Sequence, residues 1–485
     1  MTLAYIVIFI AGALLYAALT STEVIPARGR GWALLVASVL AIYLMQPPLT
    51  IRFLDFILPT MTLVITIAIW LFTRDTSAAS ADITREDKIT FGLTLALVIG
   101  LSLTRFLAPE MRPTPSRPPD PLALGLALLI AGVVIFAVWR LLRGWQGFLT
   151  AAILLIVVLF AILKTEFLAT TASALLRTTN GQNPELATAA DLSWLGISYI
   201  AFRLIHIVRE KQLGRLPAMS LREHITYVIF FPALASGPID RAERFTPDLR
   251  AVPDIQLFIP PRLVEASGRI SMGLFKKFIL GDSLALFALN PTNAAQATSA
   301  GALWLLLYAY AFRLYLDFSG YTDIVIGIGI LLGVRLPENF DLPYLKQSIT
   351  AFWQSWHITL SNWVRFYVFS PLSRTLLRYK VSSLLAVFIA QMATMLIIGL
   401  WHGVQWTFIV WGVWHGVGLF IHKVWSDRTR KRYMTLKAQP RLLRAWTIAG
   451  ILLTFHFVAL GWVWFALPDI GLAAKTFGRL FGIGF

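Results

Sequence analysis

Three histidines interrupt an apolar run near the end of the chain. The run reads LIIGLWHGVQWTFIVWGVWHGVGLFIHK over residues 396–423 and contains His402, His415 and His422. Imidazole is the ionisable side chain that is least costly to bury uncharged at physiological pH, and the neutral ring accepts a proton from a hydroxyl. Acyl transfer from a thioester to an alcohol needs such a base, a donor for the oxyanion and a dry enclosure. The run therefore indicates acid–base chemistry of this kind.

The spacing of these histidines does not favour a metal site. His415 and His422 can share a helix face, but the run lacks the i, i+4 pair of a helical zinc site and has no HExxH motif. One continuous helix would not direct His402 and His415 at the same point, because each residue turns the helix by about 100°. We therefore expect no metal, and a chain reversal at Gly403 and Gln405 between spans at 381–400 and 404–422.

A fourth histidine lies in the segment SITAFWQSWHITLSNWVRFYVFSPL, residues 348–372. His357 is accompanied there by several tryptophans and by Ser361, a composition that suits an amphipathic helix in the membrane interface. A lone histidine in such a helix is usually a hydrogen-bonded structural residue, which is the alternative to a catalytic role.

Charged residues occur inside a further apolar segment, FRLYLDFSGYTDIVIGIGILLGVRLPENFDLPY, residues 312–344. Placing charges there costs free energy unless they are paired or hydrated, as would apply to Arg313, Asp317 and Asp323. A functional cavity is therefore one interpretation. Arg313 and Asp317 are also four residues apart on a helix, and an internal ion pair is the other interpretation.

The composition is that of an integral membrane protein. The 485 residues are 57% hydrophobic and 14% charged, and the mean hydropathy is +0.71. The apolar runs are too long and lack the alternation of a β-barrel, so we expect an all-α polytopic protein with about a dozen helices. The apolar runs lie near residues 3–20, 31–47, 53–73, 89–107, 122–142, 146–163, 192–208, 224–236, 262–290, 302–334, 381–400, 404–422 and 445–466.

Charge and cysteine content limit the function further. The net charge is +17, but the basic residues gather at helix ends as the positive-inside rule requires, so we expect no nucleic-acid partner. Residues 423–444 hold eight basic residues against the single acid Asp427 and should be cytoplasmic. The absence of cysteine excludes disulfides and a thiolate nucleophile.

The proline-rich segment MRPTPSRPPDP, residues 111–121, cannot be helical throughout. We expect it to separate an N-terminal helical block of unassigned role, residues 1–120, from a block at 121–485 that carries the chemistry. Residues 1–20 lack a basic n-region and precede further spans, so we expect a retained first helix.

Six motifs, in this order, resemble the bacterial branch of the membrane-bound O-acyltransferases that acts in alginate O-acetylation, teichoic-acid D-alanyl transfer and peptidoglycan O-acetylation. They fall within residues 192–425. They are LGISYIAFRLIHIV (195–208), ASGPIDRAERF (235–245), GLFKKFILGD (273–282), DFSGYTDIVIGIGILLGVRLPENFDLPY (317–344), FWQSWHITLSNWVR (352–365) and GLWHGVQWTFIVWGVWHG (399–416). The chain departs from the family at Phe366, where relatives usually have aspartate before tyrosine, and at 371–374, where Pro-Leu-Gly-Gly reads Pro-Leu-Ser-Arg.

The resemblance implies a ring of transmembrane helices around a central tunnel in the bacterial cytoplasmic (inner) membrane. The family's hallmark histidine falls on His402 and its second polar position falls on His357, so the resemblance implies that both are catalytic. We expect His402 to act as general base on an acceptor hydroxyl, or to assist acyl passage to a partner protein, and His357 to polarise or position the thioester. The tunnel or its second layer would include Asp317, Tyr321, Asp323, Ser361, Trp401 and His415.

The resemblance also implies the reaction and its partners. An acyl group, which we expect to be acetyl, would pass from a cytoplasmic thioester, acetyl-CoA or an acyl carrier protein, to hydroxyls of an envelope polysaccharide or to an extracytoplasmic partner protein. No bound cofactor is expected. A transporter or flippase for an envelope polysaccharide or lipid is the alternative function, and a scaffold for envelope enzymes is a third.

Overall fold

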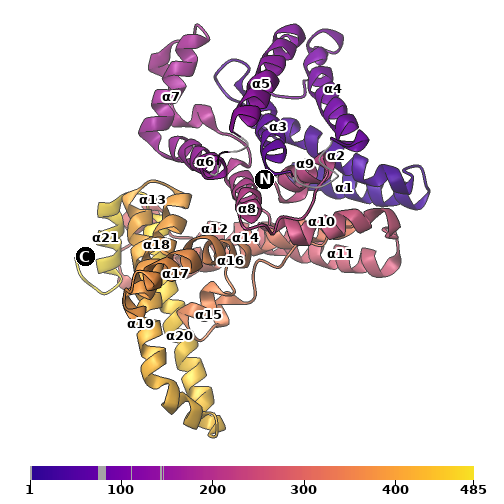
Figure 1. Ribbon diagram of the computed structural model, residues 1–485. Helices are drawn as coiled ribbons and strands as arrows, with labels where there is room; N and C mark the ends of the chain where they lie inside the picture. Colours follow the sequence, from indigo (N-terminus) through magenta and orange to yellow (C-terminus); the bar gives the residue numbers. More distant parts are fainter. Residues whose placement is uncertain (1–2, 75–82, 111, 143–144, 146, 485) are drawn as a thin grey trace. The chain divides into compact units, whose positions relative to one another are not determined.

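The computed structural model describes residues 3–74, 83–110, 112–142, 145 and 147–484, and the chain they form is helical (Figure 1). Met111, the first residue of the proline-rich segment, lies outside them. The α-helices are α1 (Leu3–Ser21), α2 (Ala27–Leu44), α3 (Leu54–Thr73), α4 (Arg85–Leu107), α5 (Pro121–Leu142), α6 (Phe148–Lys164), α7 (Glu166–Thr179), α8 (Ile197–Gln212), α9 (Leu221–Ile229), α10 (Ala242–Ala251), α11 (Pro260–Leu274), α12 (Asp282–Ala285), α13 (Pro291–Gln296), α14 (Ala300–Leu332), α15 (Ile349–Trp353), α16 (Ile358–Val364), α17 (Ser370–Arg378), α18 (Ser383–His402), α19 (Trp406–Leu436), α20 (Pro440–Ala466) and α21 (Ile470–Arg479).

Shorter helical segments connect them. Two are π-helical, η5 (Phe275–Gly281) and η7 (Arg365–Phe369). The others are 3₁₀ turns: η1 (Pro184–Leu186), η2 (Ala189–Leu192), η3 (Phe231–Ala233), η4 (Val252–Asp254) and η6 (Pro343–Leu345).

The all-α polytopic fold class is confirmed. Within the described residues, eight helices are long and apolar enough to cross a membrane, or nine if α6 and α7, which meet at 92°, form one broken span. This is fewer than the dozen expected. The run at 224–236 contains only the last six residues of α9 followed by a 3₁₀ turn. The run at 262–290 is divided between α11, η5 and α12.

The chain forms two compact units, one made of Met1–Gly268 with Val325–Leu336, the other of Arg269–Ile324 with Pro337–Phe485. The expected boundary between residues 1–120 and residues 121–485 stays a prediction, because this division reflects only how tightly the parts of the chain pack.

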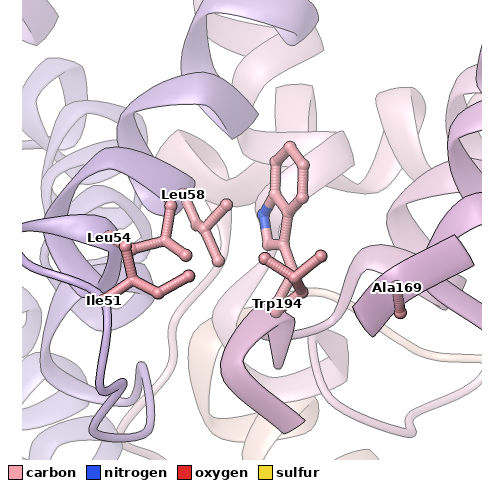
Figure 2. Packing of buried hydrophobic residues seen from close by; sticks show 6 residues of the cluster. Ile51, Leu54, Leu58, Ala169 and Trp194 are labelled. Carbon is pink, nitrogen blue, oxygen red and sulfur yellow. The ribbon is translucent and has the colours of Figure 1, made fainter. Parts of the chain in front are cut away.

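The first unit has an apolar core between α3, α7 and the segment before α8. Figure 2 shows Ile51, Leu54 and Leu58 beside Trp194, with Ala169 of α7 nearby. Burying such side chains contributes about 1.5–3 kcal/mol for each large one. The indole Nε1 of Trp194 donates to Thr62 Oγ1 at 2.9 Å, so its polar atom is satisfied within the core.

A buried carboxylate ties α7 to η2 in the same unit. Asp191 accepts hydrogen bonds from Arg177 Nε at 2.8 Å, Ser173 Oγ at 2.6 Å and Thr50 Oγ1 at 2.7 Å. Burial by itself would raise the pKa of Asp191, but these hydrogen bonds outweigh it and hold that pKa well below its usual range.

In the second unit α18, α19 and α20 pack in sequence. The expected reversal is present: α18 ends at His402 and α19 begins at Trp406. The first two helices approach closely because glycine lies at their contact. A Cβ at Gly412 would be 2.8 Å from the carbonyl oxygen of Met395, closer than packed side chains allow. This contact fixes where the end of α18, and so His402, is held.

Candidate functional site

His357 is positioned by a short backbone bridge in the second unit. Phe340 and Trp356 form an isolated antiparallel bridge, and Ile358 N donates to Asn339 O at 2.9 Å. His357 itself precedes α16 with φ of +44°, in the left-handed region that non-glycine residues rarely adopt. Such strain costs about 1–3 kcal/mol and persists only where the surroundings fix the conformation.

One amide oxygen determines which nitrogen of His357 carries the proton. Asn339 Oδ1 accepts from Thr359 N at 3.1 Å and from Thr359 Oγ1 at 2.9 Å, which identifies this atom as the oxygen. His357 Nδ1 lies 3.1 Å from the same oxygen and must therefore donate. The neutral ring then has its lone pair on Nε2, a buried atom that has no hydrogen-bond partner within the described part of the chain.

The His357 ring is enclosed. Only 3% of the residue is exposed, and Phe318 of α14 meets the ring edge to face with centroids 4.8 Å apart. His357 lies outside the eight long apolar helices. Burial lowers its pKa to about 3, so the neutral imidazole is the form present at physiological pH.

His402 ends α18 among aromatic rings. The centroid distances from its ring are 4.8 Å to Phe465, 5.7 Å to Trp411 and 5.9 Å to Phe408. The residue is half-buried. The carbonyl groups at a helix C-terminus stabilise a positive charge, so this position suits an imidazole that takes up a proton during a reaction.

Trp401 contacts both predicted catalytic histidines. Its ring centroid is 6.1 Å from that of His357 and 4.6 Å from that of His402. Since 6.1 and 4.6 add to 10.7, the two imidazole centroids are at most 10.7 Å apart. Two residues from distant parts of the sequence are therefore brought to one place.

His415 is packed more tightly than the other two. It is fully buried, and Trp353 Nε1 donates to its Nδ1 at 3.3 Å. Because an indole nitrogen only donates, the neutral His415 ring has its proton on Nε2. That nitrogen faces α20, where a Cβ on Gly461 would lie 2.9 Å from it. The Trp411 ring is 4.8 Å from the His415 ring and 5.7 Å from the His402 ring, and so connects them.

The predicted residues of α14 form a separate set of ion pairs. Asp323 is 2.7 Å from both Arg269 Nη1 and Lys276 Nζ, and Asp317 pairs with Lys277. The Arg313–Asp317 pair is not among the ion pairs of the described residues, and the Arg313 side chain is exposed. The fold places the charges of η5 against the carboxylates of α14.

The remaining predicted residues lie close to these groups. Tyr321 is buried in α14, one turn beyond Asp317. Ser361 Oγ donates to the carbonyl of Trp356 at 3.0 Å, which ties the first turn of α16 to the bridge before His357.

Two residues at this site were not singled out in the sequence, Asn339 and Trp411. Asn339 stands within the motif PENFDLPY, but its relation to His357 depends on a backbone bridge between segments that the pattern does not pair. Among the described residues, no group of three or more His, Cys, Asp and Glu side chains is placed to hold a metal ion.

Comparison with known proteins identifies the fold and the chemistry. Residues 144–461 match the membrane-bound O-acyltransferase family. The chain is 34% identical over 303 residues to the teichoic acid D-alanyltransferase of Streptococcus thermophilus, covering 59% of this chain and 72% of the relative. It is 34% identical over 373 residues to a probable alginate O-acetylase of Pseudomonas aeruginosa, covering 74% and 66%.

A peptidoglycan O-acetyltransferase of Helicobacter pylori is 36% identical over 265 residues, which cover 54% of this chain and 47% of that protein. The chain thus spans about half of this relative. The resemblance read from the six motifs is confirmed, and an enzymatic function is favoured over the transporter that the charged residues left open. The chain belongs to the membrane-bound O-acyltransferase family and is an O-acyltransferase.

Proposed function

We propose that this protein transfers an acetyl group from a cytoplasmic thioester to hydroxyls of an envelope polysaccharide, directly or through an extracytoplasmic partner protein, in the bacterial cytoplasmic membrane. The observation that carries the proposal is that the rings of His357 and His402 both pack against Trp401 within an aromatic enclosure. The names of two relatives, an alginate O-acetylase and a peptidoglycan O-acetyltransferase, support acetyl as the acyl group.

In this reaction His402 is the general base. Its imidazole takes the proton from the acceptor hydroxyl as that oxygen forms a bond to the thioester carbonyl carbon. The carbon–sulfur bond then breaks, and the departing thiolate receives the proton that His402 holds. The helix C-terminus stabilises the imidazolium between these two steps.

His357 orients the substrate. To polarise a thioester carbonyl it would need a proton on Nε2, whereas the hydrogen bond to Asn339 Oδ1 keeps the proton on Nδ1. Its Nε2 lone pair instead accepts a hydrogen bond from an N–H or O–H of the substrate. Of the two roles expected for His357, we therefore retain the positioning of the thioester and drop the polarisation of its carbonyl.

The acyl group can be identified directly. The envelope polysaccharide fraction of cells that carry the native chain, or the chain with His402→Gln, is treated with mild base, and the released acids are measured. Acetate that is lost in the variant supports the proposal. Released D-alanine in place of acetate would contradict acetyl transfer, and equal acetate from a stably folded His402→Gln chain would contradict the role of His402.

A further inference from the structure

The end of α19, residues 437–439 and the start of α20 form a helical hairpin that no step of the reaction uses. We call residues 425–446 the basic hairpin. Its two helices are antiparallel neighbours: the rings of Trp425 and Trp446 stack with centroids 6.3 Å apart and planes at 12°, and farther along Trp414 Nε1 donates to Phe457 O at 2.9 Å.

The basic hairpin carries a large excess of positive charge. Its only acid, Asp427, pairs with Lys423 one turn before it. Seven other basic side chains are exposed on both helices and the link between them. These are Arg428, Arg430, Lys431, Arg432, Lys437, Arg441 and Arg444.

The stacked indoles indicate where the membrane ends. Tryptophan favours the level of the lipid headgroups, and Trp425 is 53% exposed beside the apolar part of α19. At 1.5 Å per residue, Arg428 and Arg444 lie about 3–5 Å beyond this level, and Lys431, Arg432 and Arg441 about 8–11 Å beyond it.

These distances match the reach of an anionic membrane surface. The headgroup layer is about 5–7 Å thick on each side of the bilayer, and its potential extends over a Debye length of about 10 Å at 0.1 M salt. Two apolar side chains are exposed among the bases, Met434 (60%) and Leu442 (53%). Bases mixed with exposed apolar and aromatic side chains are typical of segments that lie against headgroups.

We propose that the basic hairpin binds the phosphate headgroups of anionic phospholipids, which hold it against the membrane surface. A soluble acidic protein is the other partner that such a charge would attract. Lipid is favoured because most of the bases lie within the headgroup layer or within one Debye length of it, where lipid phosphate is always present. The proposal does not depend on the identity of the acyl group or of the acceptor.

The experiment uses the full chain, which has no native cysteine, so that Thr435→Cys gives one fluorophore at the exposed tip. The labelled protein is reconstituted in phosphatidylcholine vesicles that contain a trace of quencher-labelled phosphatidylglycerol or quencher-labelled phosphatidylcholine. Quenching by the anionic lipid should exceed that by the neutral lipid about fivefold or more, the factor that one base near an anionic surface supplies. High salt should reduce the preference.

Two variants separate charge from shape. Replacing Arg428, Arg430 and Arg432 by glutamine should reduce the preference several-fold, because four other bases remain, whereas replacing the same three by lysine should keep it unchanged. Equal quenching by both lipids, or a preference that is undiminished in the glutamine variant or at high salt, would overturn the proposal. If polyglutamate alters the label's emission in neutral vesicles while phosphatidylglycerol does not, the hairpin is a surface for a soluble acidic protein.

Discussion

At the scale of single residues, the neighbours of each histidine decide what its ring can do. Asn339 gives His357 a proton on Nδ1 and a lone pair on Nε2, while Trp353 gives His415 the opposite arrangement. The left-handed backbone at His357 shows that this ring is held in place at a cost in stability.

Asn339 should therefore control activity without contacting the reacting atoms. Asn339→Ala removes the acceptor for Nδ1, so the Nε2 lone pair is no longer enforced. We expect acyl transfer to fall about 10–100-fold, the loss seen when groups that orient metal-bound imidazoles are removed. Asn339→Asp keeps the oxygen and should retain more activity. It should also shift the pH profile upward, because a carboxylate stabilises imidazolium.

Both variants are compared by their pH–rate profiles at matched thermal stability. A folded Asn339→Ala chain with native activity and an unchanged profile would show that the hydrogen bond only supports the fold.

The sequence predicted that His357 and His402 come together, and both rings do contact Trp401, but it did not reveal Asn339. The histidines lie in motifs with a recognisable order. The Asn339 contact depends on the Phe340–Trp356 bridge, which has no periodic signal because it pairs single residues between irregular segments. Similarly, the sequence suggested Arg313 as the partner of Asp317 from helical spacing, whereas Lys277 of η5 is the partner in the structure.

At the scale of elements, glycines determine how closely α18 and α19 approach. We expect Gly412→Ala to destabilise the protein by about 1–3 kcal/mol, because its Cβ would press on the carbonyl of Met395 2.8 Å away. Gly132→Ala in α5 is the control, since a Cβ added there would meet no neighbouring atom within 4 Å, and it should be neutral or slightly stabilising. Thermal unfolding in detergent measures both, and equal stability would contradict the close contact.

The tie between α7 and η2 should make the stability of the first unit depend on pH. Folding lowers the pKa of Asp191, so its contribution is complete above the unfolded-state pKa of about 4 and is lost as the pH falls below that value. Asp191→Asn leaves the buried Arg177 without a charged partner and should cost about 3–5 kcal/mol at neutral pH.

Unfolding followed between pH 3 and 7 tests this prediction. The difference between the native chain and Asp191→Asn should shrink toward the acid end. Asp341→Asn serves as the control, because the Asp341 side chain is 67% exposed and its pair with Lys346 should contribute little. If the stability difference between the native chain and Asp191→Asn stays constant from pH 3 to 7, the titration of Asp191 does not cause the pH dependence.

At the scale of the whole molecule, composition and motif order were enough to predict an all-α membrane acyltransferase. The number of spans was overestimated because hydropathy does not separate helices that face lipid from short helices buried in protein, such as α9, in which eight of nine residues are buried. Conversely, α19 is 31 residues long, but its Trp, His and Gly residues make it less apolar than the eight helices that qualify as membrane spans.

The topology of the site can be tested because the chain lacks cysteine. Thr435→Cys at the tip of the basic hairpin should react with a membrane-impermeant maleimide from the cytoplasmic side. Val404→Cys, at the exposed turn between α18 and α19, should react only from the opposite side. Labelling of both from one side would mean that α19 does not cross the membrane, and that His402 lies on the cytoplasmic face.

His357 and His402 are expected to serve a single reaction centre. The most direct measurement is acyl transfer by the native chain, by His357→Ala, by His402→Ala and by the double variant, all at equal folded concentration. Residues that act as a unit have non-additive effects, so the double variant should lose no more than about the larger single loss. Near-native transfer by His402→Ala, or losses that multiply fully in the double variant, would contradict it.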